Sequence, residues 1–135
     1  MMGRPAAKKD DRVTASDNHL IREVVGTVVT QKPFNLEFNG IIDGGLSSNV
    51  MINGKPAATI HSSATNNPRH ELQLLPNQSF VAPPSNQGTI TGGSGSVRIN
   101  GQPAARDGDP AETCQDLPGA TAKVAVAGNA SVLIG

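Results

Sequence analysis

An internal repeat of nine residues limits what this chain can fold into more than any other feature. Residues 50–58 read VMINGKPAA and residues 97–105 read VRINGQPAA, so seven of nine positions are identical at an offset of 47 residues. A third copy is divided between the two ends of the sequence, where residues 132–135 read VLIG and residues 3–7 read GRPAA. Repetition of this kind indicates a body built from equivalent units. We therefore expect three units around a pseudo-threefold axis, with the two ends of the sequence completing one unit.

Each unit has the pattern of a short strand that ends in a tight turn. Branched apolar residues alternate with other residues at 50–52 and 97–99, which is the period of a strand. Asn-Gly follows at 53–54 and 100–101, and both residue types tolerate positive φ. Proline then prevents the strand from continuing, and the two alanines after it are small enough to pack near an axis. The motif residues are Pro5, Ala6, Ala7, Pro56, Ala57, Ala58, Pro103, Ala104, Ala105 and Arg106.

The rest of the chain favours strands over helices. With 15 glycines and 10 prolines in 135 residues, long helices are interrupted too often to form a bundle. Three phenylalanines without tryptophan or tyrosine cannot build a thick aromatic core. Alternating or β-branched residues predict short strands at 24–29, 34–38, 123–126 and 132–134, with Gly26 at a bend or bulge of the first.

The expected fold class is all-β: a small cone of short strands with pseudo-threefold internal repeats and little or no helix. Residues 111–115 allow a helical turn, and the segment 66–84 is expected to be irregular loop. The repeats account for essentially the whole chain, so we expect a single domain over residues 1–135 without a fused effector domain. A core this thin needs support from a metal or a partner surface.

Charge and hydropathy exclude several classes of partner. Eleven basic and eleven acidic residues cancel, which disfavours nucleic acid because a row of phosphates requires a basic surplus. No run of apolar residues is long enough for a transmembrane helix, and none follows the charged N-terminus as in a signal peptide. We therefore expect synthesis in the cytoplasm without a signal peptide, with any export carried out by another machine. Cys114 is the single cysteine, which excludes an internal disulfide.

Three histidines and the cysteine form a candidate set of metal ligands. His19 and His70 each follow a motif proline by 14 residues, Cys114 follows one by 11, and His61 can supply a fourth ligand. One cysteine and three histidines suit tetrahedral Zn²⁺. The alternative is a chain whose histidines are exposed and whose Cys114 is a small buried apolar residue.

Residues 103–109, PAARDGD, resemble the motif that names the PAAR-repeat family, and residues 3–11, GRPAAKKDD, resemble the start of its short members. The literal arginine occurs only at Arg106, whereas Lys8 and Thr59 stand at that position in the other copies. The resemblance implies a sharp β-rich cone at the point of the spike in type VI secretion systems, contractile phage tails or related extracellular injection particles. It also implies a structural zinc ion near the tip, held by histidine and cysteine, a role that only His19, His61, His70 and Cys114 can match.

The function expected from this resemblance is structural and not enzymatic. One cone, monomeric when alone, would cap one trimeric β-helical spike of the VgrG or phage-hub type and help it pierce the target envelope. It would be delivered outside as part of the machine, and no stable membrane insertion is expected beyond piercing. An adaptor that attaches a separate effector through the segment 66–84 is the alternative. A zinc hydrolase is a more distant one, because catalysis needs an open coordination position.

Overall fold

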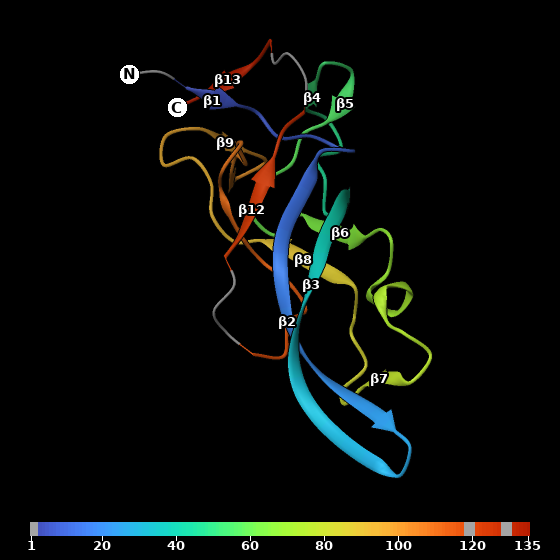
Figure 1. Cartoon of the computed structure of the whole chain (residues 1–135). Helices are drawn as coiled ribbons and strands as arrows, with labels where there is room; N and C mark the ends of the chain where they lie inside the picture. Colours follow the sequence, from blue (N-terminus) through green and yellow to red (C-terminus); the bar gives the residue numbers. More distant parts are fainter. Residues whose placement is uncertain (1–2, 118–120, 128–130) are drawn as a thin grey trace.

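The computed structural model describes residues 3–117, 121–127 and 131–135. Figure 1 shows a body that is broad at the end carrying both termini and narrow at the far end, where β2 (Arg12–Val25) turns into β3 (Val28–Gly44). Nearly all of its secondary structure is β, and the described part has one helical segment, the four-residue 3-10 helix η1 (His70–Gln73). The predicted all-β fold is confirmed.

Six antiparallel strands form a closed barrel in the middle of the molecule. They follow one another around the barrel in chain order, and closure comes from β12, which pairs with β11 on one side and with β2 on the other. The remaining strand, β7 (Gln78–Phe80), adds to the part of β2 that runs beyond the barrel. The barrel strands are β2, β3, β6 (Ser63–Asn66), β8 (Gln87–Ile90), β11 (Pro110–Glu112) and β12 (Ala122–Ala125).

Three two-stranded units with the same register make up the broad end; all three are called hairpins, although only two of them have a connecting turn. In each, the residue after the repeat's valine pairs with the motif proline: Met51 with Pro56, Arg98 with Pro103, and Leu133 with Pro5. The third pair joins the first strand of the chain to the last, without a connecting turn. The hairpins are β4 (Met51–Ile52) with β5 (Lys55–Pro56), β9 (Arg98–Ile99) with β10 (Gln102–Pro103), and β13 (Leu133–Ile134) with β1 (Arg4–Pro5).

A ring of backbone hydrogen bonds joins the three motifs. The Ala7 amide donates to Ala105 O at 2.9 Å, Ala105 N to Ala58 O at 3.1 Å, and Ala58 N back to Ala7 O at 3.0 Å. The cycle closes after three steps, as a threefold arrangement requires. The predicted pseudo-threefold relation of the motifs is therefore present in the backbone itself.

The two alanines of each motif face two different core layers. The first alanine packs between the hairpins with one isoleucine from each, in a cluster of Ala6, Ala57, Ala104, Ile52, Ile99 and Ile134. The second alanine packs at the top of the barrel, whose largest fully buried side chain is Phe38. Gly40 and Gly88 face this ring so closely that an added Cβ would lie 2.6 Å and 3.1 Å from it. Small residues at these positions thus make room for Phe38 to fill the barrel.

The position of the motif arginine has one structural role in all three copies. Arg106 Nη2 lies 2.9 Å from the carboxylate of Asp109, and Lys8 Nζ lies 3.1 Å from that of Asp11. The same carboxylates accept the backbone amides of Arg106 and Lys8. In the copy at residues 50–58 the Thr59 amide donates to the Ser62 hydroxyl instead, at 3.0 Å. The side chain three residues further on therefore caps the bend in every copy, with or without an ion pair.

Three local predictions differ from the structure. Residues 24–29 do not form one bent strand: Gly26, at φ 62°, lies in the turn between β2 and β3. Residues 110–112 are the strand β11, where a helical turn was allowed. The segment 66–84 is not plain loop, because it contains η1 and β7. No helix among the described residues is long and apolar enough to cross a membrane.

Candidate metal centre

A cluster of four buried or half-buried side chains lies between the barrel and the narrow end. Three connections meet there: the extension of β2, the segment between β6 and β8, and the segment after β11. The first carries Asp17 and His19, the second carries His70 on η1, and the third carries Cys114. The cluster therefore joins parts of the chain that are distant in sequence.

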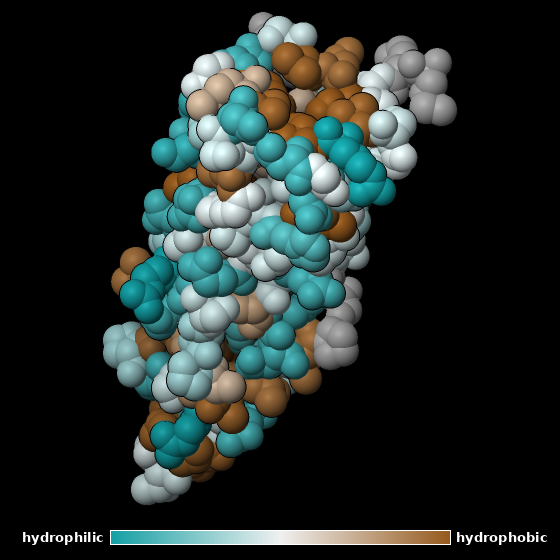
Figure 2. All heavy atoms as spheres, turned by 180° about the vertical axis from the view of Figure 1, so that it is seen from behind, coloured by the Kyte–Doolittle hydropathy of each residue, from teal (hydrophilic) through white to brown (hydrophobic). Residues whose placement is uncertain are grey.

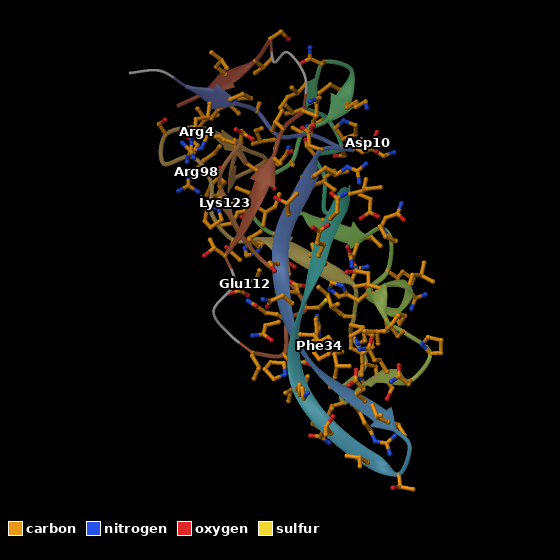
Figure 3. All side chains as sticks on the ribbon, in the orientation of Figure 1. Arg4, Asp10, Phe34, Arg98, Glu112 and Lys123 are labelled. Atoms are coloured by element: carbon orange, nitrogen blue, oxygen red, sulfur yellow. The ribbon has the colours of Figure 1, made fainter. Side chains whose placement is uncertain are left out.

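Strand geometry explains how β2 supplies two of these groups. Asp17 and His19 are two residues apart, so both side chains point to the same face of the strand, and both are fully buried. On the neighbouring strand His19 pairs with Phe34, whose place on β3 is labelled in Figure 3. His19 also packs edge-on against Phe80 of β7, with ring centroids 5.5 Å apart. These contacts hold its ring toward the interior.

The other three side chains converge on the Asp17 carboxylate. His70 Nε2 lies 2.9 Å from Asp17 Oδ2, Cys114 Sγ lies 3.6 Å from it and His19 Nε2 3.8 Å from it. Cys114 Sγ and His19 Nε2 are 3.9 Å apart. One ligand atom from each residue can be chosen such that all four lie within 4.8 Å of one another. This is a compact group of buried and half-buried ionisable side chains.

Neighbouring polar groups orient the cluster from outside. The Thr113 hydroxyl donates to Asp17 Oδ1, and Asp116 Oδ2 lies 3.4 Å from the far ring nitrogen of His19. Gln73 Nε2 lies 3.2 Å from His70 Nδ1, and Gln73 is itself fixed by two hydrogen bonds to the backbone of residue 37. Carboxylates and amides on the far nitrogen are the usual supports of metal-binding histidines.

The cluster changes the protonation of His70. Burial, the largest single influence, favours the neutral ring, but the hydrogen bonds and charges of Asp17 and Cys114 outweigh it and raise the pKa of His70 to about 9. A proton therefore holds His70 and Asp17 together unless a stronger Lewis acid takes its place. Metal binding at this nitrogen must release that proton.

The donor set fits a divalent transition metal. The set contains two imidazoles, a thiol and a carboxylate. Zinc, a borderline cation, binds nitrogen, sulfur and oxygen donors of these kinds. Ligand atoms around a tetrahedral zinc ion lie about 3.3–3.8 Å apart, close to the separations of Asp17, His19 and Cys114. His19 Nδ1 is buried without a hydrogen-bond partner of good geometry. This buried group could hold a metal ion through Asp17, His19, His70 and Cys114.

The structure gathers three of the four predicted ligands and does not place His61 with them. His61 is exposed and has φ 75°. Five residues after the other motif prolines, Asp10 and Gly108 have φ 76° and 83°, so His61 occupies a turn position that recurs in each repeat. Asp17, which the sequence prediction missed, stands in its place. The available signal was its position two residues before His19.

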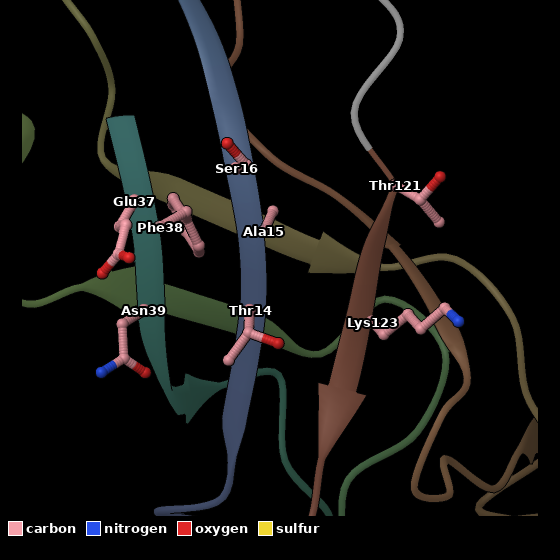
Figure 4. Close-up of a pocket in the computed structure, with 8 residues that line it drawn as sticks. All are labelled: Thr14, Ala15, Ser16, Glu37, Phe38, Asn39, Thr121 and Lys123. Carbon is pink, nitrogen blue, oxygen red and sulfur yellow. The ribbon is translucent and has the colours of Figure 1, made fainter. Parts of the chain in front are cut away.

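A surface hollow lined partly by polar side chains lies elsewhere. It is a shallow depression over β3, β2 and β12, where Figure 4 shows Glu37 and Lys123 on opposite sides of β2. Thr14 and Ser16 lie between them, and neither faces a histidine or cysteine of the cluster. The hollow is an open sheet face, in contrast to the buried cluster.

The fold is a small β-cone, and one buried polar cluster joins the three connections of its narrow half. A family model described as PAAR motif matches residues 82–135, a stretch that includes the motif copy at 97–105, Cys114 and the last strand. The resemblance to the PAAR-repeat family is thereby confirmed over these residues. No curated protein matches the chain closely enough to count as a relative. The family is a structural one and supports a role associated with the spike tip of secretion or contractile machinery.

Proposed function

We propose that this chain caps the blunt end of a trimeric β-helical spike, of the VgrG or phage-hub type, and forms the point that meets the target envelope. The observation that carries the proposal is the repetition of the three hairpins at the broad end. A threefold partner offers three equivalent contact sets, and a single chain can match them only with three equivalent surfaces. The hairpins have the same register and are joined by a closed ring of hydrogen bonds.

The chemistry of the broad end supports this contact. Met51 and Leu133, at equivalent positions of two hairpins, are exposed, as are Val97 and Val132. Figure 2 shows apolar surface gathered at this end of the molecule. Short strands with free edges invite pairing with the ends of other strands. The broad end therefore offers both apolar area and backbone groups to the exposed strands of a trimeric spike.

We further propose that the buried cluster holds one structural Zn²⁺. Such an ion would tie the three connections of the narrow half together where little apolar core exists, and so stabilise the point. Four protein donors complete a tetrahedral shell, which favours a structural site over a hydrolytic one that needs a free position for water. Delivery outside the cell would then occur as part of the machine.

Stoichiometry tests the cap. Mixing the chain with a purified trimeric spike should give a complex of one chain per three spike chains by native mass spectrometry. The double variant Met51→Asp with Leu133→Asp should weaken this complex at least about tenfold, because it places charges in an apolar contact. Leu72→Asp changes a leucine that is even more exposed and lies far from the broad end; it is the control and should bind as the unchanged protein does. Three chains bound around the sides of each trimer would contradict the proposal.

An adaptor function remains a second candidate because of one observation. Leu72 and Leu75, on the segment between β6 and β8, are exposed apolar side chains away from the broad end. They could hold a separate effector while the broad end holds the spike. Capture experiments from a secreting cell, with the unchanged chain and with Leu72→Asp, test this: recovery of spike protein alone in both cases would remove the adaptor hypothesis.

A further inference from the structure

The end of the β2–β3 hairpin carries four valines, of which Val24 is half-buried and the other three are exposed. The turn of the hairpin lies at the extreme narrow end of the molecule, beyond the barrel and the cluster (Figure 1). Val25, Val28 and Val29 have exposed fractions of 61%, 59% and 50%. Water-exposed β-branched residues in this number at the outermost point need an explanation, because a hairpin in water normally keeps apolar side chains on its covered face.

The register shows that both faces of this hairpin end are apolar. Val24 pairs with Val29, and Val25 pairs with Val28. Adjacent residues of a strand point to opposite faces, so each face carries one pair of valines. A protein groove would have to enclose the hairpin end from both sides to cover them. Figure 2 shows this apolar surface at the narrow end as a projection, so a fluid apolar phase fits its shape better than a preformed groove.

Each face also carries one cation just behind the valines. Arg22 lies on the face of Val24, and Lys32, which pairs with Ile21, lies on the face of Val25. Both are exposed, and within the described ranges neither forms an ion pair. Glu23, the one carboxylate between residues 20 and 35, is half-buried and accepts a hydrogen bond from Gln78 at 3.0 Å. The hairpin end therefore has a positive collar behind an apolar point.

The dimensions of this arrangement match the surface region of a lipid bilayer. Two residues of strand from Val24 to the turn span about 7 Å, and interfacial elements bury their apolar parts about 5–10 Å below the headgroups. Arg22 and Lys32 stand two and three residues further from the turn than Val24, about 7–10 Å along the strands, so at that depth their long side chains would reach the phosphates from the aqueous side. The edges of a two-stranded hairpin have unpaired backbone groups, which cannot enter the dry interior of the bilayer. The same feature limits insertion to the interface.

We propose that the hairpin end, residues 24–29, inserts into the interfacial region of a phospholipid bilayer, with Arg22 and Lys32 bound to anionic lipid headgroups. This inference rests on the proposed function in one respect, since it takes the narrow end to be the end that meets the target envelope. It adds a specific partner for that end, the lipid surface itself, which the hairpin end would bind before the spike is pushed through the envelope.

Flotation of the purified full chain with vesicles tests the inference without a spike. The chain should float with vesicles of phosphatidylcholine mixed with an equal amount of phosphatidylglycerol. The double variant Val25→Thr with Val28→Thr keeps the β-branched shape and adds hydroxyls, and it should lower the partition coefficient at least about tenfold. Val97→Thr with Val132→Thr, the same change at the broad end, should leave it unaltered.

The charged collar is tested in the same assay. Arg22→Gln with Lys32→Gln should lower binding to the mixed vesicles about tenfold, down to the level of binding to phosphatidylcholine alone. As the chain lacks tryptophan, a single tryptophan in place of Thr27 reports contact: brominated lipids should quench it, whereas one in place of Asn53 should not be quenched.

Three results would overturn the inference. They are no flotation of the unchanged chain with mixed vesicles, flotation unaffected by the Val25 and Val28 changes, or self-association in solution that these changes abolish. Binding of the trimeric spike is measured separately through Met51 and Leu133. A chain that caps the spike and ignores vesicles refutes only the lipid inference, whereas one that floats and does not cap refutes only the proposed function.

Discussion

The broad and narrow ends of this protein are built in opposite ways. At the broad end three hairpins repeat one pattern of residues, register and hydrogen bonds. At the narrow end the three connections differ from one another: one is a long hairpin, one contains η1 and β7, and one follows β11 and has no regular structure over its described residues 113–117. The difference indicates that symmetry is kept where a threefold partner would require it and is absent beyond the barrel.

The two ends are also stabilised by different interactions. The broad end depends on backbone hydrogen bonds that only small side chains permit, since Ala7, Ala58 and Ala105 are completely buried around the ring. The narrow half depends on one buried polar cluster joined to three connections. Substitutions in the alanine ring should therefore destabilise the whole fold. Substitutions in the buried cluster should instead affect metal binding and the structure of the narrow end.

The largest effect is expected from overfilling the ring. Ala58→Leu adds three carbon atoms beside the backbones of both other motifs, and it should lower the free energy of unfolding by about 3 kcal/mol. Denaturant unfolding followed by circular dichroism measures this. Ala82→Leu, at an exposed position, is the control and should change little. Equal stability of the two variants would show that the ring is not tightly packed.

The second prediction separates the observed cluster from the predicted ligand set. Asp17→Asn and Cys114→Ser should each lower zinc affinity about 100-fold or more, because each removes a charged donor, and should lower the melting temperature of the zinc-loaded protein. His61→Ala should change neither quantity. Competition with a chromophoric chelator gives the affinities. If His61→Ala lost as much zinc affinity as Asp17→Asn, the ligand set predicted from the sequence, which includes His61, would be supported instead.

The third prediction concerns pH and has opposite signs with and without metal. In metal-free protein, kept so by a chelator, the pKa of His70 is raised from 6.5 to about 9. The contribution of His70 to stability is therefore complete below pH 6.5 and is lost as pH rises toward 9. Zinc binding requires the neutral ring, so the zinc-loaded protein should gain stability over the same interval. Melting temperatures across this pH range, with chelator and with zinc, measure both slopes. Slopes of the same sign would contradict the prediction.

The smallest effect compares one strained turn at each end. Gly26 and Gly101 have φ of 62° and 82°, and an added Cβ would contact nothing at either position. Alanine should therefore cost about 1 kcal/mol of backbone strain in both turns. Gly101→Ala should lower the global melting temperature, whereas Gly26→Ala should only speed hydrogen exchange at the end of β2. A lower melting temperature in Gly26→Ala would show that the hairpin end is part of the cooperative core.

The sequence predicted the broad end well because its structure is determined locally. Asn53 and Asn100 each precede a glycine and adopt φ 52°, as expected for the Asn-Gly turn, and the valine-isoleucine alternation gave the short strands on either side. Repetition then implied the relation among the units. The sequence did not predict that residues 24–29 form two strands with a turn at Gly26. Apolar residues on both sides of one glycine fit a bent strand and a hairpin equally well.

What the sequence determined by itself was the repeated unit and the residue types that could bind a metal. Which of those residues meet was decided only by the tertiary structure. His61 lies in the left-handed turn that follows every motif, and such a turn directs its side chain to the surface. Asp17 reaches the cluster because it alternates in phase with His19 along β2, a strand whose full length comes from pairing with β3, β12 and β7. Spacing along the chain records neither side-chain direction nor long-range pairing, and these two quantities select the members of the cluster.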